Sequence, residues 1–275
     1  MVISLVQNSP VKGALEENLS ALDQLLVSAE DGSFVFLPEL FNTSYLLSTE
    51  DLGPDDYQKT IDWMARKAQL GRFFIAGSIP VMAGEKMYNR WLGIDEAGQM
   101  YTYDKTHLFV PGGEGRGYLA GKEVKLFNIQ GIVVRPLICY DLRFPYVSFQ
   151  DVDQPYDVLV YAANWPAPRI EQWKQLLKAR AIENQSYVVG VNRVGVDHYG
   201  NVYPGASMVV DYMGRVLVEM DDQPGLASVS IDLEAMHRYR NKFPFLKDAS
   251  PGLLGLPGKI CRDKLQNRSS DVEEG

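Results

Sequence analysis

Three residues with reactive side chains each follow a segment that we expect to be a β-strand. Glu39 comes after the apolar run 34–37, and Lys105 comes after a predicted hairpin strand. Cys139 comes directly after the apolar run 132–138. A carboxylate can act as a general base, an ammonium can stabilise a developing anion, and a thiol can act as a nucleophile. Because ligands bind at the carboxyl ends of strands in α/β sheets, these positions are typical of a ligand-binding site.

Each of these residues also has a purely structural interpretation. Glutamates and lysines at strand ends are mostly solvated surface residues. A buried cysteine is more often a small apolar core residue than a nucleophile. The residue types alone therefore leave both interpretations open, and the surrounding sequence has to decide between them.

The elements that must position these residues begin as alternating strands and helices. Apolar runs predict strands over residues 2–6, 34–37 and 73–79. Apolar residues at helical spacing predict helices over residues 15–29 and 57–70. This order of strand, helix, strand, helix and strand is typical of the α/β fold class.

The second half of the chain adds hairpins, one long helix and further strands. The predicted elements are a hairpin over 90–94 and 99–103, a strand pair over 125–129 and 132–138, a strand over 157–162, a helix over 170–184, and strands over 187–192, 206–210, 215–219 and 226–231. No linker, charge block or repeat divides the series, so we expect one continuous domain over residues 1–236. In the C-terminal extension, residues 237–275, we expect segment 243–246 to dock on the core. The polar segment 261–275 predicts a mobile tail in preference to a subunit-bridging arm.

The composition is that of an ordinary globular protein with an acidic balance. The 275 residues carry a formal net charge of -8, which argues against nucleic acid as a partner. The longest apolar runs are far shorter than the ~18 residues that cross a bilayer, so we expect no membrane partner and a cytoplasmic protein. The 2 cysteines are far apart and predict neither a disulfide framework nor a zinc site. Nucleotide-binding glycine patterns are missing too, so no metal or organic cofactor is expected.

The sequences around the three reactive residues resemble the catalytic motifs of the nitrilase, or carbon-nitrogen hydrolase, superfamily. They read FLPELF over 36–41, YDKTHLF over 103–109 and LICYDLRFP over 137–145. The three motifs occur in the family's order, and the resemblance extends from the first strand to about residue 246. It implies an α/β fold of the nitrilase type, a four-layer α-β-β-α sandwich that forms a homodimer or higher homo-oligomer through its outer helices.

The resemblance implies a catalytic role for each reactive residue. Cys139 would be the nucleophile that forms a thioester with the acyl group of an amide. Lys105 would favour the thiolate, and its ammonium would stabilise the oxyanion together with the backbone N–H of Tyr140. Glu39 would act as the general base in both half-reactions.

A fourth residue, Glu114, matches a second glutamate that the family often places beside the lysine. The resemblance implies a supporting catalytic role, whereas the structural interpretation is a loop carboxylate near a glycine turn. The family pattern frequently has histidine directly after this glutamate, and this chain has Gly115 and Arg116 instead. The details of this loop therefore differ from the family pattern.

Three further segments look like the omega-amidase branch of the superfamily. They are the sequence NWP over 164–166, ARAIENQ over 179–185 and FPFL over 243–246. Enzymes of that branch hydrolyse the terminal amide of small dicarboxylic monoamides, such as 2-oxoglutaramate or 2-oxosuccinamate, to acid and ammonia. We therefore expect a small-molecule amide and water as the partners of this chain.

Such a substrate keeps one carboxylate, which a cation has to bind. The guanidinium forks of Arg143 and Arg169 suit this role because they form bidentate hydrogen bonds with carboxylates. An ion pair with Asp141 or with a glutamate, which would only hold the loop, is the alternative for Arg143. The aromatic residues Phe41, Tyr45 and Trp165 are candidates for the pocket walls, although aromatics are more often core residues.

Other functions are compatible with the same residues. An aliphatic nitrilase or an N-carbamoyl amide hydrolase would use the same glutamate, lysine and cysteine. A papain-like hydrolase would instead pair Cys139 with His107 or His198. A non-catalytic scaffold with this fold is the third class, because a fold alone does not establish turnover.

Overall fold

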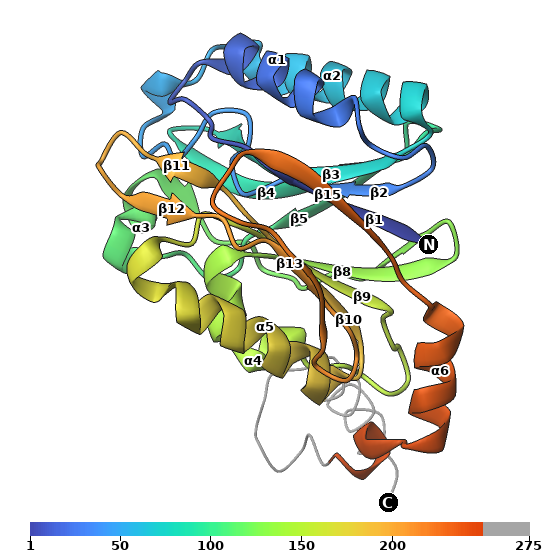
Figure 1. Ribbon diagram of the computed structural model, residues 1–275. Coiled ribbons are helices and arrows are strands. Elements are labelled where there is room, and N and C mark those ends of the chain that lie inside the picture. The colour runs from blue at the N-terminus through green and yellow to red at the C-terminus, as the bar shows by residue number, and fades with distance from the viewer. Residues whose placement is uncertain (250–275) are drawn as a thin grey trace, which may run out of the picture.

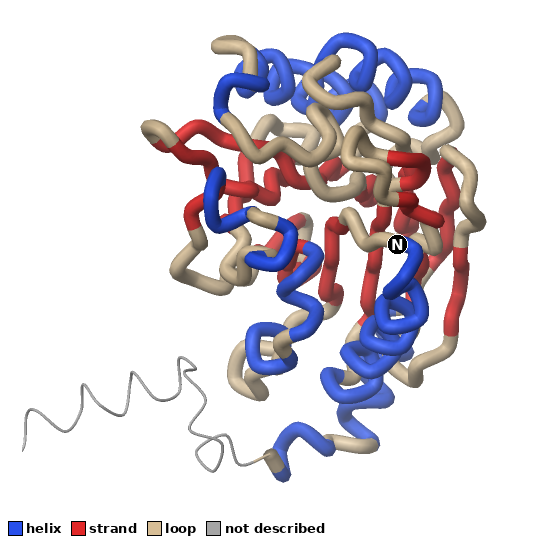
Figure 2. The backbone as a smooth tube through the Cα atoms, turned by 90° about the vertical axis from the view of Figure 1, so that its left-hand side faces the viewer, coloured by secondary structure: helices blue, strands red, loops and turns tan. Residues whose placement is uncertain are grey.

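Two β-sheets pack face to face in the computed structural model, which describes residues 1–249 (Figure 1). Helices α1 (Leu15–Leu26) and α2 (Asp56–Gly71) cover the outer face of one sheet, and α5 (Ile170–Asn184) covers the outer face of the other. The view turned by 90° also shows helices above and below the strands (Figure 2). The four-layer α-β-β-α sandwich implied by the resemblance is confirmed. The predicted tail, 261–275, lies outside the described residues.

The first sheet carries the strands that lead to Glu39 and Lys105. In spatial order its strands are β15 (Gly225–Ser230), β1 (Val2–Gln7), β2 (Phe34–Phe36), β3 (Phe74–Ala83), β4 (Lys86–Ile94) and β5 (Met100–Asp104), with β6 (Tyr118–Leu119) paired to β4. β1, β2 and β3 are mutually parallel, and the other neighbours along this order are antiparallel. Glu39 and Lys105 follow the carboxyl ends of β2 and β5, respectively.

The second sheet carries the strand that leads to Cys139. In spatial order its strands are β14 (Val216–Glu219), β13 (Met208–Val210), β10 (Tyr187–Asn192), β9 (Val158–Ala163), β8 (Ile132–Ile138) and β7 (Phe127–Ile129). The central strands β8, β9 and β10 are parallel. Cys139 and Asn164 therefore lie beyond the carboxyl ends of two neighbouring strands. A separate hairpin, β11 (Val194–Val196) and β12 (Val202–Pro204), follows β10.

Apolar side chains at the expected periodicities hold the layers together. One stripe of α1, made of Leu15, Leu19, Leu22 and Leu26, packs in the same buried cluster as Trp63 and Met64 of α2 and the outer face of the first sheet. Between the sheets, Trp91 of β4 stacks on Phe127 of β7 with ring centroids 6.3 Å apart. Burying each such side chain contributes about 1.5–3 kcal/mol to the free energy of unfolding.

Strand β3 is longer than predicted and forms a hairpin with β4 that the sequence did not indicate. The predicted strand ended at Ile79, just before Pro80, and a proline cannot donate to a central ladder. In the structure β2 pairs with residues 74–76, and the segment after β2 bonds β3 as far as Ser78, whose N–H donates to the Pro38 carbonyl oxygen. Pro80 lies beyond Ser78, where β3 pairs only with β4, opposite Asn89, and its missing N–H is tolerated.

Helix α6 (Leu233–Lys242) spans residue 236, the predicted end of the domain. The segment 243–246 touches the core through its backbone, because Gln185 Nε2 donates to the Phe243 carbonyl oxygen at 2.9 Å. The side chain of Phe245, by contrast, is 58% exposed. Two short helices, α3 (Glu114–Gly117) and α4 (Pro145–Ser148), lie in loops. No helix within residues 1–249 is long and apolar enough to span a lipid bilayer.

Candidate active site

The carboxylate of Glu39 is buried and held by three donors. Its Oε1 accepts from Asn89 Nδ2 at 2.7 Å and from Lys105 Nζ at 2.8 Å. Its Oε2 accepts from the backbone N–H of Asn164 at 2.8 Å. The donors come from β4, from the end of β5 and from the end of β9, so both sheets fix this carboxylate.

The ammonium of Lys105 lies between two buried carboxylates. Its Nζ is 2.8 Å from Glu39 Oε1 and 2.7 Å from Glu114 Oε1, and all three side chains are about 1% exposed. Burial acts to lower the pKa of Lys105, but the charges of Glu114 and Glu39 outweigh it and hold that pKa well above its usual range. The two carboxylates therefore favour the charged form of Lys105 at this position.

Glu114 also anchors the loop that follows Lys105. Its Oε2 accepts a hydrogen bond from the backbone N–H of Phe109, and its other oxygen binds the lysine. The loop reaches this position through Gly113, whose φ of 86° lies in the left-handed region that glycine adopts without strain. Burial raises the pKa of Glu114, although the lysine charge lowers it.

Cys139 lies at a strained turn between β8 and a short 3-10 helix, Cys139–Arg143. Its φ of 43° is unusual for a residue with a side chain. Its Sγ donates to the carbonyl oxygen of Asn164 at 3.8 Å. Burial and then the charge of Glu39 raise the pKa of the thiol well above its usual range, although Lys105 lowers it. Lys105 thus favours the thiolate electrostatically, as expected, but burial and the charge of Glu39 have larger effects in the opposite direction.

A cavity of about 460 Å³ opens over these groups. Glu39, Lys105, Glu114 and Cys139 all line it. So do the four residues predicted to bind substrate, which are Tyr140, Arg143, Trp165 and Arg169. Within residues 1–249 no group of three His, Cys, Asp or Glu side chains is placed to hold a metal ion. The arrangement can supply a nucleophile, a proton acceptor and a fixed cation to one small molecule.

Comparison with known proteins shows the family to which the chain belongs. The family model for carbon-nitrogen hydrolase matches residues 2–241. This chain belongs to the carbon-nitrogen hydrolase family. The family resemblance seen in the three motifs is thereby confirmed.

Two relatives of this carbon-nitrogen hydrolase are named for their activity. Omega-amidase YafV of Yersinia enterocolitica is 38% identical over 256 residues, which cover 92% of this chain and 98% of that protein. The 2-oxoglutaramate amidase of Bacillus subtilis is 33% identical over 250 residues, which cover 90% and 96%. Among solved structures, XC1258 from Xanthomonas campestris, a CN-hydrolase superfamily protein with an arsenic adduct in its active site, has a TM-score of 0.82 at 33% identity. That match covers 91% of this chain and 97% of the other.

Asp141 is a buried residue of this carbon-nitrogen hydrolase to which the sequence analysis gave no site role. Its Oδ2 accepts from Tyr103 Oη at 2.7 Å and from the Ile138 N–H at 3.0 Å. Its Oδ1 accepts from Thr106 Oγ1 and the His107 N–H, both at 3.0 Å, and from His107 Nδ1 at 2.8 Å. Asp141 thus ties the turn that carries Cys139 to the segment that follows Lys105. Its place two residues after Cys139, within the third motif, was the available signal.

The histidines lie away from the thiol. His107 binds Asp141 through Nδ1, contacts Tyr146 Oη through Nε2 at 2.6 Å and stacks on Phe144. Neither His107 nor His198 lines the cavity of the carbon-nitrogen hydrolase. The papain-like alternative therefore lacks a histidine base in the structure.

The two predicted substrate arginines have different partners. Arg143 Nη2 donates to Gln172 Oε1 at 2.6 Å, and its guanidinium lies 4.8 Å from the Trp165 ring centroid. The alternative ion pair of Arg143 with Asp141 does not form, because the carboxylate of Asp141 is bound by the donors described above. The guanidinium of Arg169 lies 5.5 Å from the centroid of the Phe109 ring and forms no ion pair with a carboxylate of residues 1–249.

Of the three aromatic residues predicted as pocket walls, the structure brings two to the cavity. Tyr45 and Trp165 line it, and Tyr45 Oη donates to the Gly112 carbonyl oxygen at 3.4 Å. Phe41 does not, because it is fully buried in the cluster between the first sheet and helices α1 and α2. Tyr203 of β12, which the sequence analysis did not single out, closes another side.

Asn89 is a second functional candidate that the sequence analysis missed. It lies in the middle of β4, is fully buried, and donates to the carboxylate of Glu39. A polar residue at an inward-facing strand position was the available signal, because buried polar side chains need a partner. The boundaries of β4 were not known well enough from the sequence to identify that position as buried.

Proposed function

We propose that this chain is an omega-amidase that hydrolyses the terminal amide of small dicarboxylic monoamides, such as 2-oxoglutaramate or 2-oxosuccinamate. The observation that carries the proposal is the convergence of Glu39, Lys105 and Cys139 in one cavity that arginines also line. The names of the two relatives at 38% and 33% identity support the same substrate class.

The first half-reaction forms a thioester on Cys139. Because the resting group is a thiol, Glu39 has to accept its proton as sulfur attacks the amide carbon. The C–S bond forms while the carbonyl π bond opens to an oxyanion. The ammonium of Lys105 and the backbone N–H of Tyr140 stabilise that oxyanion. Glu39 then gives its proton to the nitrogen, and the C–N bond breaks to release ammonia.

The second half-reaction returns the enzyme to its starting state. Glu39, again a carboxylate, takes a proton from a water molecule whose oxygen attacks the thioester carbon. A second oxyanion forms at the same donors and collapses with cleavage of the C–S bond. The proton on Glu39 returns to the sulfur of Cys139, and the dicarboxylic acid leaves. One amide and one water are consumed for each acid and ammonia.

The part of the substrate that does not react carries a carboxylate, which the arginines bind. Arg169 suits this role because its guanidinium contacts the Phe109 ring and the N–H donors of that guanidinium have no partner within residues 1–249. Arg143 contacts the Trp165 ring through its guanidinium in a similar way. A bidentate hydrogen bond between a guanidinium and a carboxylate sets the orientation of the amide relative to sulfur.

The decisive experiment is mass spectrometry of protein mixed with 2-oxoglutaramate. We expect an acyl adduct on the peptide that contains Cys139 and none on the peptide that contains Cys261, with ammonia released in solution. Glu39→Gln is expected to lower ammonia release by at least about 10²-fold, because general base catalysis contributes that much. Cys139→Ala is expected to abolish it while the protein stays folded.

Parallel assays distinguish the related activities. Release of ammonia from an aliphatic nitrile or from an N-carbamoyl amino acid at a higher kcat/KM than from 2-oxoglutaramate would overturn the substrate assignment. Undiminished turnover by Cys139→Ala would overturn the mechanism as a whole.

A further inference from the structure

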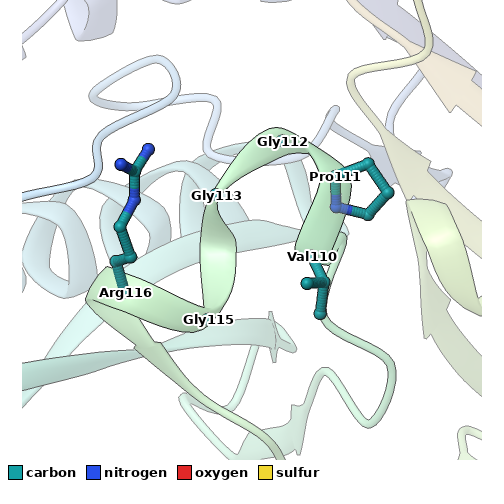
Figure 3. Close-up of a pocket in the computed structure, with 6 residues that line it drawn as sticks. All are labelled: Val110, Pro111, Gly112, Gly113, Gly115 and Arg116. Atoms are coloured by element: carbon teal, nitrogen blue, oxygen red, sulfur yellow. The ribbon is translucent and has the colours of Figure 1, made fainter.

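A second hollow adjoins the catalytic cavity, on the loop that carries Glu114. It has a volume of about 380 Å³ and is lined by Val110, Pro111, Gly112, Gly113, Gly115 and Arg116 (Figure 3). Pro111, Gly112 and Arg116 line the catalytic cavity as well, so the two spaces meet at these residues. Three of its six lining residues are glycines, and the other three present two apolar side chains, Val110 and Pro111, and one charged side chain, Arg116.

Arg116 is exposed, and its guanidinium lies against Gly113. A Cβ at position 113 would lie 2.5 Å from Nη2, and the φ of 86° at Gly113 also favours glycine there. Lys86 Nζ of β4 donates to the carbonyl oxygen of Gly115 at 3.2 Å. The Arg116 guanidinium itself has no hydrogen-bond or ion-pair partner within residues 1–249.

The charges that line the catalytic cavity do not cancel. The buried group formed by Lys105 between Glu39 and Glu114 has one negative charge in excess. The arginines at positions 116, 143 and 169 add three positive charges, so the cavity is positive by two in a protein whose net charge is -8. One substrate carboxylate neutralises only one of these charges. The cavity is complementary to a substrate with two anionic groups.

We propose that Arg116 and the glycine loop 110–116 form a second anion subsite, which binds a second carboxylate on the acid portion of the substrate amide. The inference rests on the proposed function, since it takes the first carboxylate to lie at Arg169 and Arg143. It adds a specificity-determining residue and a substrate class, the terminal monoamides of tricarboxylic acids. The loop includes Gly115, where the family pattern frequently has histidine.

Two amides with the same five-carbon chain test the proposal. One is glutaric acid monoamide, with one carboxylate. The other is the terminal monoamide of propane-1,2,3-tricarboxylic acid, which is the same chain with a second carboxylate on its central carbon. We expect Arg116→Gln to lower kcat/KM for the tricarboxylic monoamide about 10- to 100-fold, because a hydrogen bond between two charged groups is lost. The kcat/KM of the same variant for glutaric monoamide should stay within about twofold of the wild-type value.

Three further variants serve as comparisons. Arg116→Lys keeps the charge without the planar fork and should fall between wild type and Arg116→Gln. Arg169→Gln should lower kcat/KM for both amides. Arg66→Gln removes the same charge from an exposed position on α2, far from the cavity lining, and should change neither.

The outcomes distinguish a failure of the second anion subsite from a failure of the proposed omega-amidase function. If wild type hydrolyses glutaric monoamide but not the tricarboxylic monoamide, or if Arg116→Gln affects both amides equally or neither, the second subsite is overturned while the omega-amidase function stands. If wild type hydrolyses neither these amides nor 2-oxoglutaramate, the proposed function itself fails. Thermal unfolding of each variant shows whether a lost activity reflects a lost fold.

Discussion

The thiol of Cys139 donates a hydrogen bond to the carbonyl oxygen of Asn164 at 3.8 Å. The N–H of the same Asn164 donates to the carboxylate of Glu39 at 2.8 Å. One residue at the end of β9 thus positions both the proposed nucleophile and its proposed base. It does so across the two sheets, because Glu39 comes from the first sheet and Cys139 from the second. The thiol has to turn from the carbonyl oxygen toward Glu39 when it gives up its proton.

The raised pKa of Cys139 predicts the pH dependence of its alkylation. Only the thiolate reacts with iodoacetamide, so in a Cys261→Ser background the rate should keep rising through pH 9 and should not level off near neutrality. The charge of Glu39 is one cause of the raised pKa. Glu39→Gln should therefore shift the alkylation curve to lower pH while it lowers turnover. A plateau below pH 8 in the otherwise wild-type protein would contradict the prediction.

The sequence was most informative where a reactive residue lies within a recognisable local motif. The three motifs around Glu39, Lys105 and Cys139 sufficed to predict the fold, and the structure brings these residues into one cavity. The bonds to Asn164 and Asp141 were not predictable, because they join segments far apart in the chain. Hydrogen bonds between sheets depend on how the layers pack, which periodicity does not encode.

The pKa of the Cys139 thiol shows a second reason why the sequence alone did not predict the whole site. Proximity of Lys105 to Cys139 predicts a stabilised thiolate if the lysine charge alone is considered. Burial and the charge of Glu39 act in the opposite direction and are larger, and both become known only from the packed structure.

Glu114→Gln is expected to lower kcat by about 10²-fold. The change removes one of the two carboxylate charges that flank the ammonium of Lys105. It also places an amide NH₂ toward the backbone N–H of Phe109, which is itself a donor. Because the charge of Glu114 raises the pKa of Lys105, its loss should move the alkaline limb of the kcat/KM profile to lower pH. The exposed Glu85, in the turn between β3 and β4, provides the control Glu85→Gln, which should leave both kcat and the profile unchanged.

Asn89→Leu is expected to lower kcat about tenfold with little change in KM. The substitution keeps the branched shape of the side chain but removes the donor to Glu39 Oε1, and one hydrogen bond to a charged group contributes about 1.5–3 kcal/mol. Asn42→Leu is the matched control, because Asn42 is a buried asparagine whose amide donates to Thr60 Oγ1. If both variants lose the same stability and the same kcat, Asn89 acts only through the fold.

Asp141→Asn is expected to lower the free energy of unfolding by about 3 kcal/mol and kcat with it. The carboxylate accepts five hydrogen bonds, and an amide in its place would direct its NH₂ at donors such as Tyr103 Oη and the Ile138 N–H. The turn at Cys139 would then lose the contacts that hold its strained φ, so nucleophile and oxyanion donor would move together. Denaturant unfolding and ammonia release measure the two effects.

The control for Asp141 comes from a different turn. Asp95 is also largely buried and accepts from Ala97 N, Gln99 N and Tyr101 Oη in the β4–β5 hairpin, which does not line the cavity. Asp95→Asn should therefore lower the free energy of unfolding while the folded fraction keeps the kcat of wild type. If Asp141→Asn behaves in the same way, with stability lost and kcat retained, then the hydrogen bonds of Asp141 support the fold without positioning Cys139.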